Sequence, residues 1–332
     1  MTASVIIPAY NASGTIKKAV QSVIEQNNCD FEILIIDDGS TDDTPGQAAQ
    51  LLKQDARISY HRLVKSGIAR ALNFGIKMSQ GQYIVRMDAD DEALPQRIDK
   101  LTDYLNQHND VGLVASLVQY KGDERSHQGY YRYVEWVNSI LSHDDTFTHR
   151  FRESPFAHPS VCFRKSLFAQ YGGYHEGPYP EDYELWLRWL QHGVIMHKLD
   201  EPLLIWHDRP NRLSRTHIHY SQEQFFKVKS RYFHQWLLDQ YGYSDWPEIY
   251  VWGAGRAVNN RVKHLAKYGV YPDRYIDVKK HLDSKFLHYS DIPPPGDHLI
   301  LSYVSDWKGR VEIEEYLQQK GYLAGQTYFM MA

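Results

Sequence analysis

The most informative segment of this chain is Tyr-Ile-Val-Arg-Met-Asp-Ala-Asp-Asp, at residues 83–91. Its first part, residues 83–87, is a short and mostly apolar run that predicts a buried strand. Three carboxylates follow within four residues, and burying them unpaired is costly. Along an extended backbone Asp88 and Asp90 point the same way, and oxygen ligands at this spacing suit Mg²⁺ or Mn²⁺. A solvated acidic turn is the alternative interpretation.

The composition predicts a globular protein of about two domains. With 332 residues, 42% of them hydrophobic, each half can bury a core. A net charge of −4 gives no general reason to expect binding to nucleic acid.

The cysteines and the apolar runs bear on the cellular compartment. Cys29 and Cys162 are not in a CxxC pair, which excludes a disulfide framework or thiolate zinc site. A strand-like run begins at Val5, leaving no room for a signal peptide, and no apolar run reaches the ~18 residues of a membrane span. We therefore expect a cytoplasmic protein.

Strand-like and helix-like patterns alternate over the first 120 residues. Apolar runs predict strands at 5–7, 31–36, 58–63, 83–87 and 111–118, with Pro8 breaking the first because it lacks an N–H. Apolar residues at helical spacing predict helices around 16–24, 68–78 and 98–105. This alternation indicates βαβ units and a mostly parallel sheet.

Ligands of such sheets bind beyond the carboxyl ends of the strands. Three polar clusters follow strands here, at residues 8–11, 37–40 and 88–91. Further along, residues 158–163 predict a strand, and helices are expected from about 180 and over 225–236. Residues 123–152 have no clear period and predict a loop or short helices. We therefore place the site at the edge that carries the three polar clusters.

A second domain is predicted after a break in the pattern at residues 241–247. A strand at 249–252 leads into Gly253-Ala254-Gly255 and a helix, and a further strand ends at Asp277. A strand at 299–302 and a helix at 311–320 complete the unit. The predicted domains are 1–240 and 248–332, the latter a small Rossmann-like α/β domain.

The ordered motifs of the first domain resemble family-2 glycosyltransferases. They are VIIPAYN at 5–11, DDGSTD at 37–42, GIARALNFG at 67–75, RMDADD at 86–91, HPSV at 158–161, YGGY at 171–174 and EDYELW at 181–186. The resemblance covers about residues 3–220 and implies the GT-A fold, in which a mostly parallel central sheet is flanked by helices. It also implies a nucleotide-sugar donor, expected to be a UDP-sugar, and a hydroxyl acceptor.

The resemblance assigns the donor site. Asp90, with Asp88, would hold Mn²⁺ or Mg²⁺, which stabilises the charge of the departing diphosphate. The nucleotide would contact Tyr10 by stacking and Asp38 through its carboxylate. The remaining positions of the nucleotide site are Pro8, Arg70 and Asp88. For Tyr10 a core aromatic is the other reading, and for Arg70 a solvated helix face.

The resemblance also assigns the chemistry. Asp182 would be the base that deprotonates the acceptor, and the helix dipole is expected to lower its pKa. The enzyme would transfer a hexosyl or N-acetylhexosaminyl group, with inversion of the anomeric configuration, to a glycan or glycolipid of surface polysaccharide biosynthesis. Residues 206–215 resemble a segment that closes over the diphosphate through Arg212 or Arg215, whereas His207 is a doubtful metal ligand. A glycolipid acceptor would be compatible with peripheral contact of the protein with the inner face of the membrane.

Two other functions are compatible with parts of the sequence. The Gly253-Ala254-Gly255 turn, with Asp277 about 20 residues on, is typical of an NAD(P)-dependent oxidoreductase, but Val258 occupies the third glycine position. A non-catalytic sugar-nucleotide-binding module is the second alternative. For the C-terminal domain we favour a structural or protein-interaction role over nucleotide binding.

Overall fold

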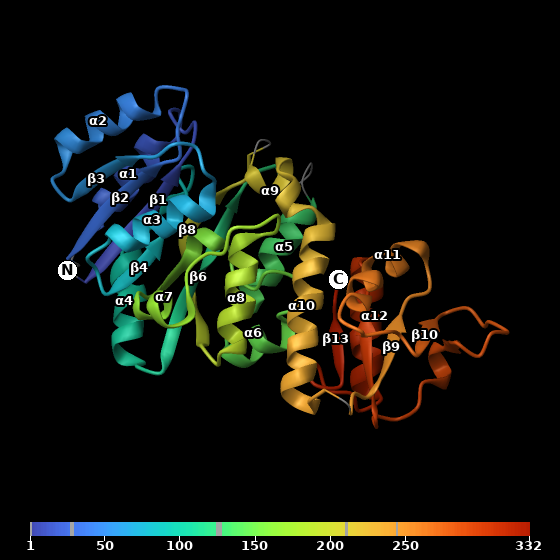
Figure 1. The fold of residues 1–332 in the computed structure, drawn as a ribbon. Helices are drawn as coiled ribbons and strands as arrows, with labels where there is room; N and C mark the ends of the chain where they lie inside the picture. The colour runs from blue at the N-terminus through green and yellow to red at the C-terminus, as the bar shows by residue number, and fades with distance from the viewer. Residues whose placement is uncertain (1, 27–29, 124–127, 210–211, 244) are drawn as a thin grey trace. The chain divides into compact units, whose positions relative to one another are not determined.

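The computed structural model describes residues 2–26, 30–123, 128–209, 212–243 and 245–332 (Figure 1). Cys29 lies outside these ranges, and Cys162 is buried. The chain divides into two compact units. The first comprises Met1–His143, Phe156–Gly177 and Glu181–Thr216, and the second comprises Asp144–Pro155, Pro178–Pro180 and His217–Ala332.

The first unit is built on an eight-stranded sheet. From edge to edge its strands are β3 (Ile58–Arg62), β2 (Phe31–Asp37), β1 (Ala3–Ala9), β4 (Tyr83–Arg86), β7 (Val161–Arg164), β6 (Val111–Lys121), β8 (Ile195–His207) and β5 (Glu92–Ala93). The first four are parallel to one another, and β6 is parallel to β8. β7 is antiparallel to both of its neighbours, and β5 is antiparallel to β8. The sheet is therefore mostly parallel, as predicted.

Helices cover both faces of the parallel part of the sheet. Helices α1 (Ile16–Ile24), α2 (Thr44–Gln54) and α4 (Arg97–Gln107) share one core with Val5 and Ile7 of β1. Helix α3 (Ile68–Met78) packs on the opposite face, because alternate side chains of a strand point to opposite sides. An added Cβ on Gly75 would lie 2.7 Å from Ile6, so this glycine lets α3 approach the sheet closely.

Strand β1 differs from its prediction, because it continues through Pro8 to Ala9. The Ile6 carbonyl accepts from Met87 N, so Pro8, two residues further on, also faces the β4 side. The pairing with β4 ends at Ile6, so the missing N–H of Pro8 removes no bond from that ladder. A second difference lies at residues 158–163, where a 3₁₀ turn, η1 (His158–Ser160), precedes the short β7.

The remaining elements of the middle of the chain are mostly helical. They are α5 (Gln128–Ser139), α6 (His143–His149), α7 (Ser166–Tyr171), α8 (Glu181–Gln191), α9 (Leu213–Thr216), η2 (Ile218–Tyr220) and α10 (Gln222–Tyr241). None of the helices in the described part of the chain is both long and apolar enough to cross a membrane. The sequence prediction missed β8, since Lys198, Asp200 and Glu201 interrupt its apolar pattern.

The second unit holds an all-parallel, five-stranded sheet. Its order is β11 (Phe286–His288), β10 (Arg274–Asp277), β9 (Glu248–Trp252), β12 (His298–Ser302) and β13 (Tyr328–Met330). Helix α11 (Arg256–Ala266) follows β9, η3 (Tyr289–Asp291) follows β11, and α12 (Trp307–Gln319) follows β12. Strands lie on both sides of β9, so this unit is more complete than the truncated form expected from sequence.

Helix α10 belongs to the second unit by its contacts. The rings of Phe233 and Trp236 lie 5.4 and 4.7 Å from that of Phe329 on β13. Phe151, from the segment Asp144–Pro155, lies 5.8 Å from the same ring. The sequence interpretation had grouped both segments with the first domain. The boundary near residues 241–247 stays a prediction, and Ser244 within it lies outside the described residues.

Candidate active site

Loops at the carboxyl ends of β1 and β2 are hydrogen-bonded to each other. The Asn11 N–H donates to Ser40 Oγ over 2.9 Å, and the Asn11 side-chain oxygen accepts from Thr41 N over 2.8 Å. Strand β4 runs parallel to β1, so the loop that follows it begins at the same edge. The three polar clusters of the sequence therefore lie at one edge of the sheet, as predicted.

The loop after β4 carries a cluster of three carboxylates. One oxygen from each of Asp88, Asp90 and Asp91 lies within 4.8 Å of the others. Asp91 is buried and its Oδ1 accepts from His207 N over 2.9 Å. Its Oδ2 is buried and accepts no hydrogen bond from any residue that the structure describes. A buried carboxylate oxygen of this kind, beside two more carboxylates, fits a divalent cation with oxygen ligands.

The electrostatics of the cluster also fit a cation. Burial raises the pKa of Asp91 well above its usual value, and the charges of Asp88 and Asp90 raise it further. Burial and the charge of Asp88 likewise raise the pKa of Asp90. The ionised forms are disfavoured by desolvation and by one another. A divalent cation among the three oxygens would relieve both effects.

Three arginines face these carboxylates. The buried Arg86, at the end of β4, contacts Asp88 Oδ1 through its Nη1. Arg212 Nη2 lies 4.0 Å from Asp88 Oδ2, and Arg209 Nε lies 3.7 Å from Asp90 Oδ2. Part of the negative charge is therefore balanced by the protein itself.

The position of Arg212 is set by aromatic and backbone contacts. Its guanidinium lies 4.3 Å from the centre of the Trp206 ring, and Nη1 donates to the His207 carbonyl over 2.9 Å. Arg215 differs, since it pairs with Asp208. Burial lowers the pKa of Arg212, but Asp91 and Asp88 outweigh burial and raise it. Arg212 therefore faces the site, and Arg215 pairs with Asp208 in the same segment. Residues 210–211, which separate Arg209 from Arg212, lie outside the described residues.

His207 is turned away from the carboxylate cluster. Its ring Nε2 contacts Glu92 Oε1, and the same oxygen pairs with Lys18 over 2.7 Å. Only the backbone N–H of His207 reaches the cluster, through Asp91. The partner of the His207 imidazole in this structure is therefore the Glu92 carboxylate and not the carboxylate cluster.

The proposed nucleotide side carries an exposed ring and a buried carboxylate. Tyr10 is 43% exposed, and Lys65 Nζ lies 3.8 Å from its ring centre, so it is not a core aromatic. Asp38 is buried and accepts from Ser66 N, Ser66 Oγ and Gly67 N over 2.7, 3.1 and 2.9 Å. The loop before α3 is therefore tied to the end of β2. Pro8 is half-buried in β1.

Arg70 lies on an exposed part of α3. Its Nε donates to Glu176 Oε2 over 2.6 Å, and both side chains are more than half exposed. An exposed pair of this kind contributes little to stability. The contact joins α3 to the loop that precedes α8, so a phosphate role for Arg70 requires this pair to open.

Asp182 lies in the first turn of α8. Its Oδ1 accepts from Tyr183 N over 2.7 Å, and the side chain is half-buried. Burial raises the pKa of Asp182 to about 6, although this hydrogen bond and the charge of Arg86 act in the opposite direction. The expectation of a lowered pKa was wrong, because desolvation outweighs the helix terminus. A carboxylate with this pKa is still mostly ionised at pH 7.

Two sets of hydrogen bonds that hold the backbone of residues 171–174 were not predicted from the sequence. Arg188 of α8 donates to the carbonyls of Tyr171, Gly172 and Gly173. Asn73 of α3 bonds both backbone groups of Tyr174, over 2.7 and 2.9 Å. Both sets depend on backbone positions that no sequence period reports. Arg86 lies in the RMDADD motif but received no role in the sequence interpretation, although a charge inside an apolar strand is a signal in itself.

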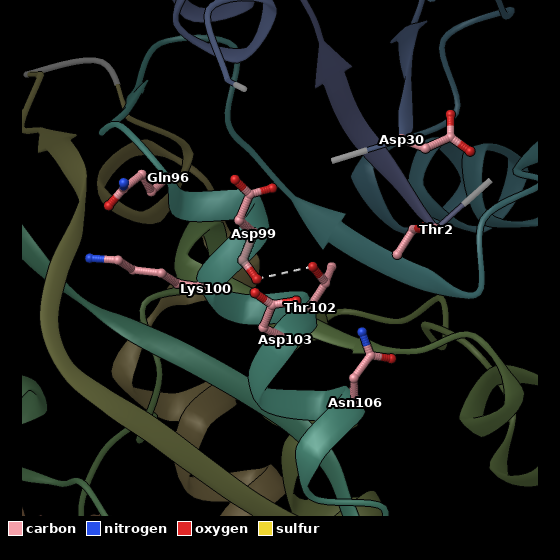
Figure 2. Close-up of a pocket in the computed structure, with 8 residues that line it drawn as sticks. All are labelled: Thr2, Asp30, Gln96, Asp99, Lys100, Thr102, Asp103 and Asn106. Carbon is pink, nitrogen blue, oxygen red and sulfur yellow. Dashed lines mark hydrogen bonds between the residues drawn. The ribbon is translucent and has the colours of Figure 1, made fainter. Parts of the chain in front are cut away.

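A separate pocket of about 440 Å³ lies elsewhere in the first unit (Figure 2). It is lined by Thr2 and Asp30, which precede β1 and β2, and by residues around α4 such as Asp99 and Asp103. These strands run in parallel, so the pocket lies at their amino ends. The carboxylate cluster lies at the opposite end.

The glycine turn of the second unit is less open than a dinucleotide fingerprint requires. Gly253 has φ +113°, and an added Cβ would lie 2.7 Å from Val258 Cγ2. Asp277 ends β10 as predicted, and its carboxylate pairs with His281 over 2.7 Å. The third glycine of the fingerprint serves close helix packing, and a buried valine fills that place here.

Comparisons with known proteins agree with this architecture. An uncharacterized glycosyltransferase of Haemophilus influenzae is 28% identical over 232 residues, covering 68% of this chain and 71% of that protein. A UDP-Gal:alpha-D-GlcNAc-diphosphoundecaprenol beta-1,3-galactosyltransferase of Escherichia coli is 29% identical over 179 residues, covering 54% of this chain and 63% of the relative. A Rickettsia conorii glycosyltransferase is 35% identical over 167 residues, which is 50% of this chain but 26% of that protein.

Solved structures share the fold at low sequence identity. S. aureus TarS 1-349 in complex with UDP-GlcNAc has a TM-score of 0.54 and 16% identity, covering 81% of this chain and 71% of that chain. The mannosyltransferase PcManGT from Pyrobaculum calidifontis, in complex with GDP-Man and Mn²⁺, has a TM-score of 0.51 and 15% identity, covering 80% and 69%. The predicted fold class is confirmed. The sequence also matches the model of Glycosyl transferase family 2 over residues 4–172, that is 169 of 332 residues. This chain therefore belongs to glycosyl transferase family 2.

Proposed function

We propose that the first unit transfers a sugar, with inversion, from a UDP-sugar to a hydroxyl acceptor. The observation that carries the proposal is the cluster of Asp88, Asp90 and Asp91 at the carboxyl edge of a family-2 sheet, with a buried, unbonded Asp91 oxygen among the described residues. The E. coli relative is named for a UDP-sugar donor, and one TarS structure contains UDP-GlcNAc.

A divalent cation is part of this proposal. Asp90 and Asp88, with Asp91 beside them, would hold Mn²⁺ or Mg²⁺. When bound, such an ion stabilises the negative charge that develops on the diphosphate leaving group. The PcManGT structure contains Mn²⁺, which supports a metal in this fold. The cluster offers only carboxylate oxygens, in keeping with either ion.

Arg212 and Arg209 supply positive charge from the protein. Both guanidinium groups lie near the cluster, at 4.0 Å from Asp88 and 3.7 Å from Asp90. These distances are too long for strong ion pairs, so both groups keep donors for phosphate oxygens. Arginine binds phosphate bidentately. We assign Arg212 to the diphosphate and leave Arg215 as the partner of Asp208.

The nucleotide would lie over the loops after β1 and β2. Tyr10 offers an exposed ring for stacking on the base. An ionised carboxylate accepts about four hydrogen bonds, and Asp38 already accepts three. One acceptor site thus remains for the uracil N3–H. Pro8 and Arg70 complete the proposed nucleotide site, Arg70 after release from Glu176.

Asp182 would act as the base of the transfer. Its carboxylate takes the proton from the acceptor hydroxyl while that oxygen attacks the anomeric carbon, and the bond to the diphosphate breaks on the opposite side. A pKa of about 6 leaves it ionised at pH 7 and gives it more basicity than an ordinary aspartate. The side chain is half-buried at the start of α8, so part of its surface stays accessible.

The acceptor is proposed to be a glycan or glycolipid of surface polysaccharide biosynthesis, receiving a hexosyl or N-acetylhexosaminyl group. The E. coli relative is named for a diphosphoundecaprenol-linked acceptor, and an Erwinia amylovora relative for amylovoran biosynthesis. A lipid-linked acceptor would place this enzyme at the inner face of the membrane.

The second unit is proposed to have a structural or interaction role. Val258 fills the space beside Gly253, which argues against an NAD(P)-dependent oxidoreductase. Calorimetry of the full chain with NAD tests this point. Micromolar binding that survives substitution of Asp90 but is lost in Gly255→Asp would assign a dinucleotide site to the second unit.

The proposal is tested by release of UDP from candidate UDP-sugars with Mn²⁺ and with EDTA. A thermal-shift screen of the same donors identifies the sugar first, because a ligand at a hundredfold excess over Kd stabilises the protein by ~2.7 kcal/mol. Donor hydrolysis or transfer that requires Mn²⁺ supports a metal-assisted transferase. Binding without turnover, with every candidate acceptor, would favour a non-catalytic module.

A further inference from the structure

Arg86 is a charged residue inside a buried strand. It is the last residue of β4 and follows the apolar residues Ile84 and Val85. Its side chain is 2% exposed, whereas that of its partner Asp88 is 22% exposed. Burying a guanidinium is costly unless its charge is compensated by an ion pair or by hydrogen bonds. The contacts of the Arg86 charge therefore indicate its role at the site.

The guanidinium contacts one donor carboxylate directly and acts on the proposed base through its charge. Nη1 contacts Asp88 Oδ1, and Nε donates to no residue in the described part of the chain. The charge of Arg86 also lowers the pKa values of Asp90 and Asp182, whereas that of Asp88 raises both. One buried cation therefore acts on carboxylates from two different loops.

Two other titratable groups near Arg86, His158 and Tyr174, are held uncharged. His158 is buried, and burial together with Arg86 lowers its pKa well below the usual value. Its Nε2 bonds the Tyr174 hydroxyl over 2.8 Å, and burial raises the pKa of that phenol. Glu181 lies 3.8 Å from the other nitrogen of His158. Neutral His158 and Tyr174 leave Arg86 to interact with carboxylates.

Arg97 provides a comparison within the same region. It is also buried, but it donates to the carbonyls of Arg86 and Pro159 over 2.8 and 2.5 Å, and it lies 3.2 Å from Met87 sulfur. Arg97 therefore connects backbone segments and forms no ion pair with any residue that the structure describes. Arg86 pairs with a side chain of the site.

We propose that Arg86 is a positioning residue, whose guanidinium fixes the Asp88 side chain at the donor site and whose buried charge is shared between Asp88 and Asp182. This inference rests on the proposed function, because it assigns Asp88 to the donor and Asp182 to the base. In this arrangement Asp88 keeps Oδ2 for the donor, while Oδ1 is held by Arg86. Removing the charge would make Asp182 harder to ionise and would leave Asp88 free to rotate.

The experiment compares Arg86→Gln, Arg86→Lys and the control Arg97→Lys. The first readout is a ¹³C NMR titration of the Asp182 carboxyl without substrate or metal, with its signal assigned by its absence in Asp182→Asn. We expect the Asp182 midpoint to move to higher pH in Arg86→Gln and to stay within a few tenths of a unit in Arg86→Lys and Arg97→Lys. A purely structural role would not separate glutamine from lysine in this way.

The second readout is the kinetics of transfer with a saturating cation. Lysine keeps the charge but lacks the planar fork of arginine. We expect Arg86→Lys to lose about tenfold in kcat/KM with an unchanged pH profile. In Arg86→Gln the acidic limb of the profile should move to higher pH and the loss should be larger. If Arg86→Gln does not fold, the Arg86→Lys variant and Asp88→Asn still separate charge from geometry, because Asp88→Asn should lower the Asp182 midpoint.

The two proposals fail in different ways. The NMR titration needs no turnover, so it tests Arg86 even if no UDP-sugar is transferred. An Asp182 midpoint that is unchanged in both Arg86→Gln and Asp88→Asn would overturn the Arg86 proposal and leave the transferase proposal intact. If the wild-type protein shows no turnover but the Asp182 midpoint still moves to higher pH in Arg86→Gln, the result would count against the transferase proposal alone.

Discussion

The backbone N–H of His207 donates to Asp91 Oδ1 over 2.9 Å and thereby joins the end of β8 to the acidic loop after β4. Strand β8 is far from this loop in sequence, and the segment that follows it carries Arg209 and Arg212. The hydrogen bond therefore brings two arginines beside the carboxylates of the proposed metal site. Its contribution comes from a backbone group, so the side chain at position 207 is free for another contact.

This relationship predicts different effects for two substitutions of His207. His207→Ala keeps the N–H, so the affinity for Mn²⁺ should stay within a few-fold of wild type. His207→Pro removes the donor and leaves both oxygens of a buried carboxylate unbonded, at a cost of about 1–3 kcal/mol in the free energy of unfolding. Mn²⁺ titration followed by electron paramagnetic resonance and urea denaturation measure the two effects. A hundredfold loss of Mn²⁺ affinity in His207→Ala would identify the imidazole as a ligand.

Removal of Asp90 should separate metal binding from folding. Asp90→Ala relieves repulsion with Asp88, so the metal-free protein should be as stable as wild type or slightly more so. The stabilisation by Mn²⁺, ~2.7 kcal/mol at a hundredfold excess over Kd, should disappear together with transfer. Thermal unfolding with and without Mn²⁺ checks both points, with substitution of the exposed Asp43, which directly precedes α2, by alanine as the control. Full transfer in EDTA would contradict a metal-assisted reaction.

Substitution of the proposed base should act on kcat. Asp182→Asn is nearly isosteric, so UDP-sugar affinity should stay close to wild type while kcat falls by about 10²–10⁴-fold. Calorimetry with the donor and steady-state kinetics measure the two quantities. NMR of the product should show the inverted anomeric configuration. A variant within tenfold of wild type would assign the proton transfer to another group.

The pH dependence of transfer follows from the same residue. The pKa of Asp182 is raised to about 6, and only its ionised form accepts a proton. Activity should therefore be full at pH 7 to 8 and fall about tenfold per unit well below pH 6. A bound cation near Asp88 would lower this pKa, so the midpoint in the loaded enzyme should lie at or below about 6. A rate that rises on acidification would exclude Asp182 as the base.

Tyr10 should affect nucleotide binding and little else. Its ring is 43% exposed, so Tyr10→Ala removes little packing. Loss of base stacking should weaken UDP binding by about 1–3 kcal/mol, whereas Tyr10→Phe should bind UDP normally. Isothermal calorimetry with UDP and Mn²⁺ compares the two. Equal affinity in Tyr10→Ala would place the base elsewhere.

The order of elements in the first unit was predictable because the local pattern is strong there. Continuous apolar runs at β2 and β4 and the helical spacing in α3 each report burial over a few neighbouring residues. The second unit was less predictable, since β11 and β13 are three residues long and gain their stability by pairing with β10 and β12. Strand β8 was missed for a related reason, because the charged residues around Asp200 hide a strand that long-range pairing stabilises.

The proposed chemical residues could be chosen from the sequence, since Asp88, Asp90 and Asp182 stand in motifs whose order and spacing are local. The pKa values of Asp90 and Asp182 depend on the folded structure. The pKa of Asp182 depends on burial and on Arg86, which is almost a hundred residues away in the chain. The roles of His207, Arg212 and Arg215 were likewise decided by partners on other elements. Desolvation and charge act through space, so a linear pattern reports the groups but not their surroundings.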